Sequence, residues 1–63
     1  MVTVGSVWNS SDFKAFKVFD VVNDGAKNWV HYHLYEVNKN NDNQPRYSCY
    51  EEAFVQRFSK SVV

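Results

Sequence analysis

The chain of 63 residues is predicted to be mainly β (α+β), forming a small antiparallel SH3-like barrel or curled sheet with one short C-terminal helix. Two segments, 13–22 and 28–37, are rich in β-branched and aromatic residues, and a turn sequence separates them. Near the C-terminus, aromatic residues recur at the spacing of one face of a helix: Tyr50, Phe54 and Phe58. The length allows one domain, residues 1–63, with one small core.

A hairpin is expected to form the centre of the sheet. The turn between its strands is Asn23-Asp24-Gly25, in which Gly25 can adopt a positive φ. In segment 13–22, the apolar residues Phe16 and Val18 share a face, whereas Val21 falls on the other one. This break in the alternation predicts a β-bulge near Phe19-Asp20. A further short strand, residues 4–8, precedes the hairpin and ends at a polar turn, residues 9–12.

The second strand of the hairpin alternates more regularly and therefore predicts which side is buried. Val30, Tyr32 and Leu34 form one face, which we expect to join the core. The opposite face carries polar and aromatic side chains that need no burial: Trp29, His31, His33 and Tyr35.

The C-terminal third begins with an Asn-rich loop, residues 38–45, that has no apolar side chain before its terminal Pro and is expected to be exposed and mobile. A short strand over 46–48 should follow, and then a helix over 49–58. Ser48 and Glu51 have the spacing of a capping box, in which each side chain would bond the other's backbone N–H. Residues 59–63 can add an edge strand.

Composition excludes several broad classes of protein. Seven acidic and seven basic residues give no net charge, which argues against a general nucleic-acid coat or a membrane-surface protein. The N-terminal residues lack the basic start and apolar run of a signal peptide, and no apolar segment reaches membrane-spanning length. With Cys49 as the single cysteine, no internal disulfide is possible, and we expect a cytoplasmic protein.

Residues that could carry chemistry are few. His31 and His33 would point the same way from a strand, and Asp20, Glu36 or Cys49 could add a further metal ligand. No ligand-pair spacing such as Cys-x-x-Cys occurs, so we expect no metal site and no cofactor.

Cys49 would lie in the first turn of the expected helix, where the helix dipole lowers a thiol pKa. A buried structural thiol explains the residue as well, and so short a chain offers little material for a substrate cleft. We therefore expect no catalytic residue and no enzymatic activity.

Binding is the function class that the composition favours. A protein partner would use the aromatic and histidine face, because such side chains join large apolar area to a polar tip: Phe19, Trp29, His31, His33 and Tyr35. An exposed edge strand could also pair with a partner strand or a second copy, as in a homodimer or a homo-oligomeric structural component. The alternative is a small nucleic-acid-binding domain that uses basic residues beside the same aromatics: Lys14, Lys17, Arg57 and Lys60.

The order of short motifs also resembles a known group of proteins. Gly5-Ser-Val-Trp8 opens the chain, a hairpin and Cys49 follow, and Phe54-x-x-Arg57-Phe58 ends it. This layout is similar to that of short, uncharacterised proteins of tailed bacteriophages and prophages, although the Asn-rich loop is longer than in the shortest of them. The resemblance implies a small β-rich accessory protein in the host cytoplasm. The resemblance itself supplies no activity. Inhibition is the commonest way in which such small proteins act, and together with the missing catalytic set this leads us to expect non-enzymatic modulation of a host or phage protein such as a defence component.

Overall fold

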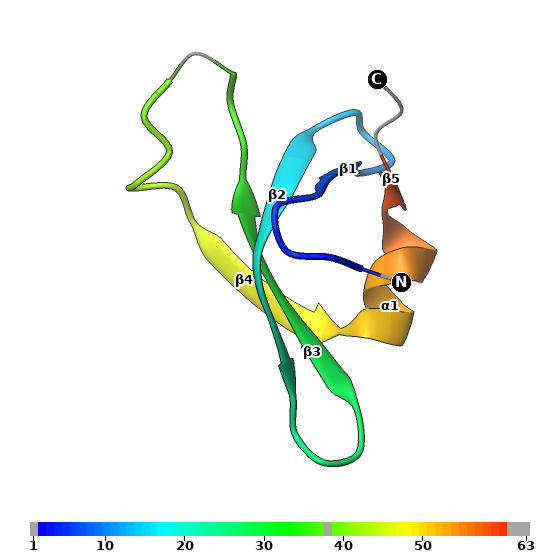
Figure 1. Ribbon diagram of the computed structural model, residues 1–63. Coiled ribbons are helices and arrows are strands. Elements are labelled where there is room, and N and C mark those ends of the chain that lie inside the picture. Colours follow the sequence, from blue (N-terminus) through cyan, green and yellow to red (C-terminus); the bar gives the residue numbers. More distant parts are fainter. Residues whose placement is uncertain (1, 38, 61–63) are drawn as a thin grey trace.

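A computed structural model describes residues 2–37 and 39–60 (Figure 1). The elements, in chain order, are β1 (Val7–Asn9), β2 (Ala15–Asn23), β3 (Asn28–Leu34), β4 (Arg46–Tyr50), α1 (Glu51–Arg57) and β5 (Ser59–Lys60). The strands form one antiparallel sheet in the order β4-β3-β2-β1-β5. The prediction of a mainly β chain with one short C-terminal helix is confirmed. Within the described residues β4 and β5 are the two edges and do not pair, so the sheet is not closed into a barrel. No helix in this part of the chain is long and apolar enough to cross a membrane.

The predicted hairpin and its bulge are both present. β2 pairs with β3 over almost its full length, and the register shifts between Val18 and Asp20. The extra residue in the bulge returns Val21 to the same face as Val18, where it packs against the core. In the turn, Gly25 has a φ of 97°, and the Asp24 carboxylate accepts the backbone N–H groups of Ala26 and Lys27. The turn is therefore closed by backbone conformation and by side-chain hydrogen bonds together.

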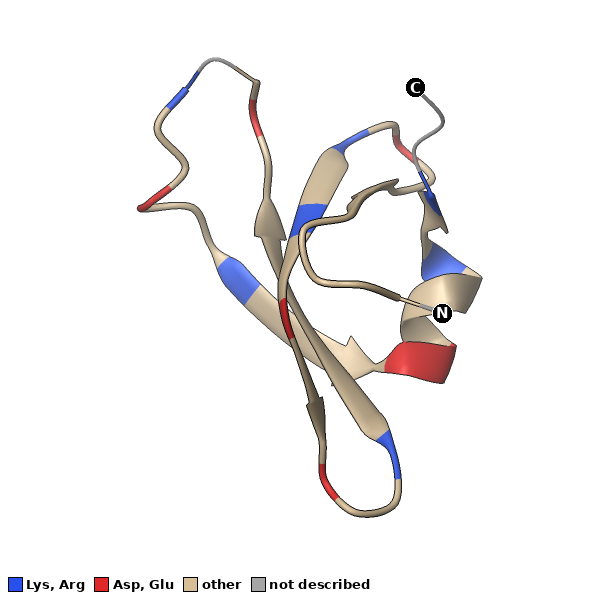
Figure 2. Ribbon diagram, in the orientation of Figure 1, with Lys and Arg blue, Asp and Glu red and all other residues tan. Residues whose placement is uncertain are grey.

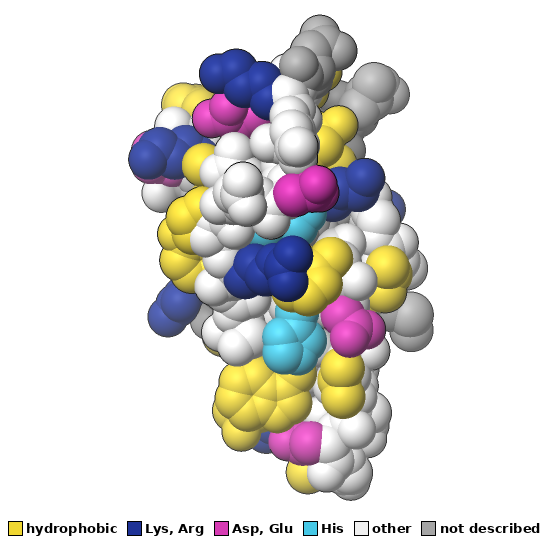
Figure 3. Space-filling model, turned by 90° about the vertical axis from the view of Figure 1, so that its left-hand side faces the viewer, with side chains coloured by type: hydrophobic (Ala, Val, Ile, Leu, Met, Phe, Trp, Pro, Cys, Tyr) yellow, Lys and Arg dark blue, Asp and Glu magenta, His cyan; other side chains and the backbone are white. Residues whose placement is uncertain are grey.

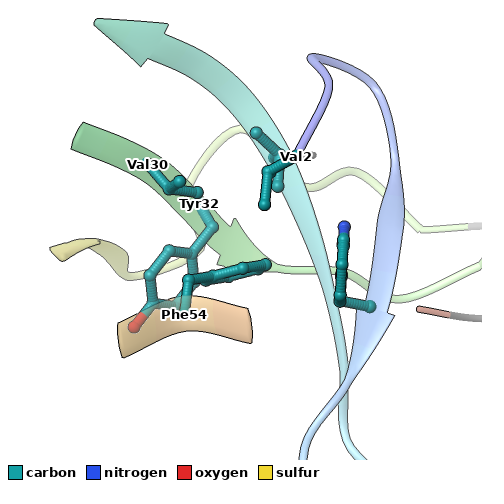
Figure 4. Close-up of a cluster of buried hydrophobic side chains, with 6 residues drawn as sticks. Val2, Val30, Tyr32 and Phe54 are labelled. Carbon is teal, nitrogen blue, oxygen red and sulfur yellow. The ribbon is translucent and has the colours of Figure 1, made fainter. Parts of the chain in front are cut away.

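The core lies between the inner face of the sheet and α1 (Figure 4). Because α1 connects edge strand β4 to edge strand β5, it must cross this face, and its Phe54 ring is fully buried there. The ring centroid lies 5.1 Å from that of Trp8 and 5.1 Å from that of Tyr32. The buried hydrophobic set is Val2, Trp8, Val18, Val30, Tyr32 and Phe54. As predicted, the face of β3 that carries Val30 and Tyr32 is the buried one, but Leu34, also expected in the core, is only partly buried and does not belong to the buried set.

The start of the helix differs from the prediction. α1 begins at Glu51, its N-cap residue is Tyr50, and no side chain caps it. The capping box of Ser48 with Glu51 is therefore wrong, because Ser48 is inside β4, opposite His31. Pairing of β4 with β3 continues to Tyr50 and keeps this segment extended. The Glu51 carboxylate instead accepts the Val2 N–H at 2.9 Å and the Asn28 side-chain amide at 3.3 Å.

The later start of α1 also changes the positions of Tyr50 and Cys49. Phe54 and Phe58 stack with centroids 4.6 Å apart, but Tyr50 belongs to β4 and is 37% exposed. Cys49 lies in β4 opposite Val30 and not in a first helical turn. Burial raises the pKa of its thiol, with a smaller opposing effect of Arg57, so the expected lowering by a helix dipole is wrong.

Other element bounds also differ. The first strand, predicted over 4–8, is Val7–Asn9. Gly5 takes a φ of 89°, and although its N–H donates to the Val18 carbonyl, regular pairing with β2 begins only at Val7. β2 begins at Ala15 and not at Phe13, which has a φ of 64° and is 91% exposed. β3 stops at Leu34, and β5 is seen as Ser59–Lys60. Residue 38 of the predicted loop and residues 61–63 of the predicted edge strand lie outside the described residues.

Candidate partner-binding face

The outer face of β2, β3 and β4 carries aromatic and basic side chains without a covering layer in the described structure (Figure 3). In β3 these side chains alternate with buried Val30 and Tyr32, so they point away from the core. Their strand partners on β2 and β4 must share this direction. Asp20, Val22 and Ser48 lie on the same side of the sheet. We call the aromatic and basic members of this side the outer aromatic face: Lys17, Phe19, Trp29, His31, His33, Arg46 and Tyr50.

Phe19 is the centre of the upper part of the face. It occupies the bulge of β2, and this places its ring on the outer side, where it remains 40% exposed. The ring stacks on His33 with centroids 5.8 Å apart and approaches His31 at 6.0 Å. The Arg46 guanidinium carbon lies 5.4 Å from the ring centroid, within the range of a cation–π contact. Figure 3 shows a basic side chain beside a hydrophobic one, between the two histidines.

Trp29 and Tyr50 form the lower part of the face. They are cross-strand partners, and their ring centroids are 4.3 Å apart. The Trp29 Nε1–H donates to Asp24 at 2.9 Å, so the indole is held from both its face and its edge. The backbone N–H groups of Lys27 and Ala26, followed by the indole N–H, lower the pKa of Asp24. Lys27 lies over the Tyr50 ring, with its Nζ 4.9 Å from the centroid.

A groove of about 530 Å³ borders the outer aromatic face beside the N-terminal segment. Tyr35, just beyond the end of β3, forms one wall, and Lys17 Nζ lies 5.5 Å from its ring centroid. Asn41 also lines the groove and is held in place by the backbone of Glu36: its side-chain oxygen accepts the Glu36 N–H, and its side-chain N–H donates to the Glu36 carbonyl. The remaining side of the groove includes Phe19 and His33, so the groove is continuous with the upper part of the face.

The residues predicted to bind a partner are therefore largely brought together. Four of them lie on the outer aromatic face: Phe19, Trp29, His31 and His33. Tyr35 lies beside it, in the wall of the groove. Sequence reasoning missed Arg46 and Tyr50, although the segment Arg46–Tyr50 alternates as a strand does. That alternation could have identified both residues, but Tyr50 also fits the helical spacing of Phe54 and Phe58, which favoured a helix.

The basic residues of the nucleic-acid alternative are spread over the molecule (Figure 2). Lys17 is on the outer aromatic face, and Lys14 lies in the preceding turn, 3.9 Å from Asp12. Arg57 is on α1, close enough to the inner-face residue Cys49 to influence its pKa. Lys60 is on the opposite edge strand, paired with Trp8. These four residues do not form one basic surface.

The residues considered for chemistry are also separated. The two histidines are on the outer face and Cys49 is on the inner face of the same sheet, so they cannot act as nucleophile and base. The Phe19 ring contacts both histidines, and no cluster of three potential ligands occurs among residues 2–37 and 39–60. The outer aromatic face thus offers stacking, hydrogen bonding and cationic contacts.

Comparison with known proteins adds no relative. No family model, no curated protein and no solved structure matches this chain. A functional interpretation therefore depends on the geometry of the outer aromatic face and on the resemblance of the motif order.

Proposed function

We propose that this chain is a small, non-enzymatic phage accessory protein that binds a host or phage protein through its outer aromatic face and modulates it. Inhibition of a host enzyme or of a defence component, in the host cytoplasm, is the expected mode of action. The phage origin is supported by the resemblance of the Gly5-to-Trp8 opening and the Phe54-to-Phe58 ending. The mode of binding is supported by the geometry of the face.

The observation that carries the proposal is a set of exposed and half-buried rings already held in position. Phe19 is supported by His33 and Arg46, and Trp29 by Tyr50 and Asp24. Side chains held in this way lose little conformational entropy when a partner covers them. Trp, Tyr and Arg are also the residue types most enriched among residues that dominate binding energy.

The test compares two Phe→Ala substitutions. Phe19→Ala removes the centre of the face, whereas Phe13→Ala removes a ring that is 91% exposed in the β1–β2 turn. Tagged forms of the unaltered chain and both variants would be used to capture partners from nuclease-treated bacterial lysate, with mass spectrometry as the readout. We expect a stoichiometric protein to be retained by the unaltered chain and Phe13→Ala, and lost with Phe19→Ala. Retention by all three forms would reject the face as the binding site.

The same face also supports a second candidate, a single-stranded nucleic-acid-binding domain. Lys17 and Arg46 each lie over an aromatic ring there, and stacked bases with nearby cations are the usual elements of such sites. Binding of a labelled oligonucleotide would then weaken steeply with salt concentration. Lys17→Gln would reduce the salt dependence, whereas Lys60→Gln, on the far edge, would not. Absence of oligonucleotide binding at low salt would eliminate this candidate.

A further inference from the structure

We propose that the β4 edge is a self-association site, at which Arg46–Tyr50 pairs in antiparallel fashion with Arg46–Tyr50 of a second copy around a two-fold axis at Ser48. β4 pairs with β3 on one side only, and four of its five residues are exposed. A five-residue strand with one unpaired side is a template for a further strand. This inference does not depend on the proposed function.

The direction of the backbone groups in β4 follows from two hydrogen bonds at the other end of the sheet. The Val18 N–H donates to the Ser6 carbonyl, so the backbone groups of Val18 point away from β3. The Tyr35 N–H donates to the Ala15 carbonyl, so the backbone groups of Tyr35 point towards the β2 side. In an antiparallel strand, the N–H and C=O groups of successive residues point alternately to its two sides. Those of Tyr32, the partner of Val18, and of Val30 therefore point towards β4. The N–H and C=O groups of their partners, Tyr47 and Cys49, point back to β3. The N–H and C=O groups of Arg46 and Ser48 and the N–H of Tyr50 consequently point to the open edge, whereas the C=O of Tyr50, the N-cap residue, accepts the first hydrogen bond of α1.

These outward groups match themselves in one register. With Ser48 opposite Ser48 of the second copy, Arg46 lies opposite Tyr50 of that copy. The Ser48 pair exchanges both of its hydrogen bonds, and in each Arg46–Tyr50 pair the Tyr50 N–H donates to the Arg46 carbonyl. The register uses the whole strand, because Ser48 is its central residue and α1 begins directly after Tyr50. All outward groups of β4 except the Arg46 N–H, at the end of the strand, therefore gain a partner in the pairing.

The side chains agree with the same register. Arg46 and Tyr50 both lie on the outer aromatic face, so each Arg46 meets the Tyr50 ring of the other copy and gains a second aromatic contact beside Phe19. At the axis, the two Ser48 side chains are small and uncharged. The pairing thus places Arg46 opposite Tyr50 at each end and two uncharged serines at its centre, so no like charges face each other.

β4 also has few of the features that usually protect an edge, Arg46 being its one charged residue. It contains no Pro, no bulge and no Lys, and Pro45 precedes the strand instead of interrupting it. The other edge, β5, has only Ser59–Lys60 within the described residues and includes a lysine. Dimerisation through β4 would join two outer aromatic faces into one continuous surface.

The first experiment is crosslinking by a single cysteine. In a Cys49→Ser background, Ser48→Cys would place two thiols on directly opposite residues, about 5.5 Å apart at Cα, which suits a disulfide. Mild oxidation should give a covalent dimer. Ser59→Cys in the same background is the matched control on β5 and should remain monomeric. Equal dimer yields from the two variants would overturn the proposal, with far-UV circular dichroism used to confirm that both are folded.

The second experiment separates the backbone from the side chain. Ser48→Pro removes one outward N–H, whereas Ser48→Ala keeps it, and an edge strand tolerates the proline on its open side. Sedimentation equilibrium should show a dimer for the unaltered chain and for Ser48→Ala, and at least about tenfold weaker association for Ser48→Pro. An unaltered chain that stays monomeric up to about 1 mM would also overturn the proposal.

Discussion

The two faces of the sheet carry similar aromatic residues but differ in how far these residues are buried. On the inner face, Trp8, Tyr32 and Phe54 are buried against one another beneath α1. On the outer face, Phe19 and Tyr50 remain exposed although each contacts a neighbouring ring. The difference lies in the covering element, because α1 crosses only one side of the sheet. Aromatic content alone therefore does not identify a core, and the inner rings should contribute to stability while the outer rings contribute to binding.

The strongest test of this comparison is the truncation of one ring on each face. Phe54→Ala should lower the free energy of unfolding by about 3–5 kcal/mol, which is comparable to the whole stability expected of so small a domain. Phe19→Ala should lower it by about 1 kcal/mol or less, because its ring is already partly solvated. Urea denaturation followed by circular dichroism measures both. If Phe54→Ala does not fold, Phe54→Leu provides a smaller and measurable loss. Equal losses at the two positions would contradict the division between the faces.

The second test concerns the N-terminal segment, which helps to close the inner face. Glu51→Gln removes the charge that accepts the Val2 N–H, and a hydrogen bond to a charged group typically contributes about 1.5–3 kcal/mol. We expect a loss near the lower end of that range, because the bond is only partly buried. Glu52→Gln is the matched control, since Glu52 forms only an exposed ion pair with Lys27, and it should cost less than about 1 kcal/mol. Chemical denaturation of both variants gives the comparison.

Part of the pH dependence of stability should have the same origin, beside the contributions of Asp12 and Asp24, whose pKa values are also lowered. The Val2 N–H, and then the Asn28 amide, hold the pKa of Glu51 below its ordinary value of 4.5. A carboxyl group with a lowered pKa in the folded state stabilises the fold above its ordinary pKa, and this contribution disappears as pH falls through the lowered value. The melting temperature should therefore fall as the pH drops below about 4.5. The fall should be shallower in Glu51→Gln, and identical acid profiles of the two proteins would contradict this assignment.

The sequence was most informative where a local pattern allowed only one structural interpretation. The alternation of Val30 and Tyr32 with polar residues identified the buried face of β3, and the break before Val21 identified the bulge. It was least informative at residues 48–51, where strand and helix signals overlap. There the pairing of β4 with β3, a long-range interaction, determines the outcome. No local pattern reveals that pairing, so the membership of Arg46 and Tyr50 in the outer aromatic face was also missed.

The smallest expected effect tests this boundary directly. Were Ser48 a helix cap, Ser48→Ala would cost about 1 kcal/mol. Ser48 instead lies within β4, with an exposed side chain and no bond to the helix, so the change in the free energy of unfolding should stay within about 0.5 kcal/mol. Urea denaturation with Phe54→Leu as a sensitivity control can resolve the two cases. A loss near 1 kcal/mol would mean that the helix starts earlier, and that the strand available for pairing at this edge is shorter than Arg46–Tyr50.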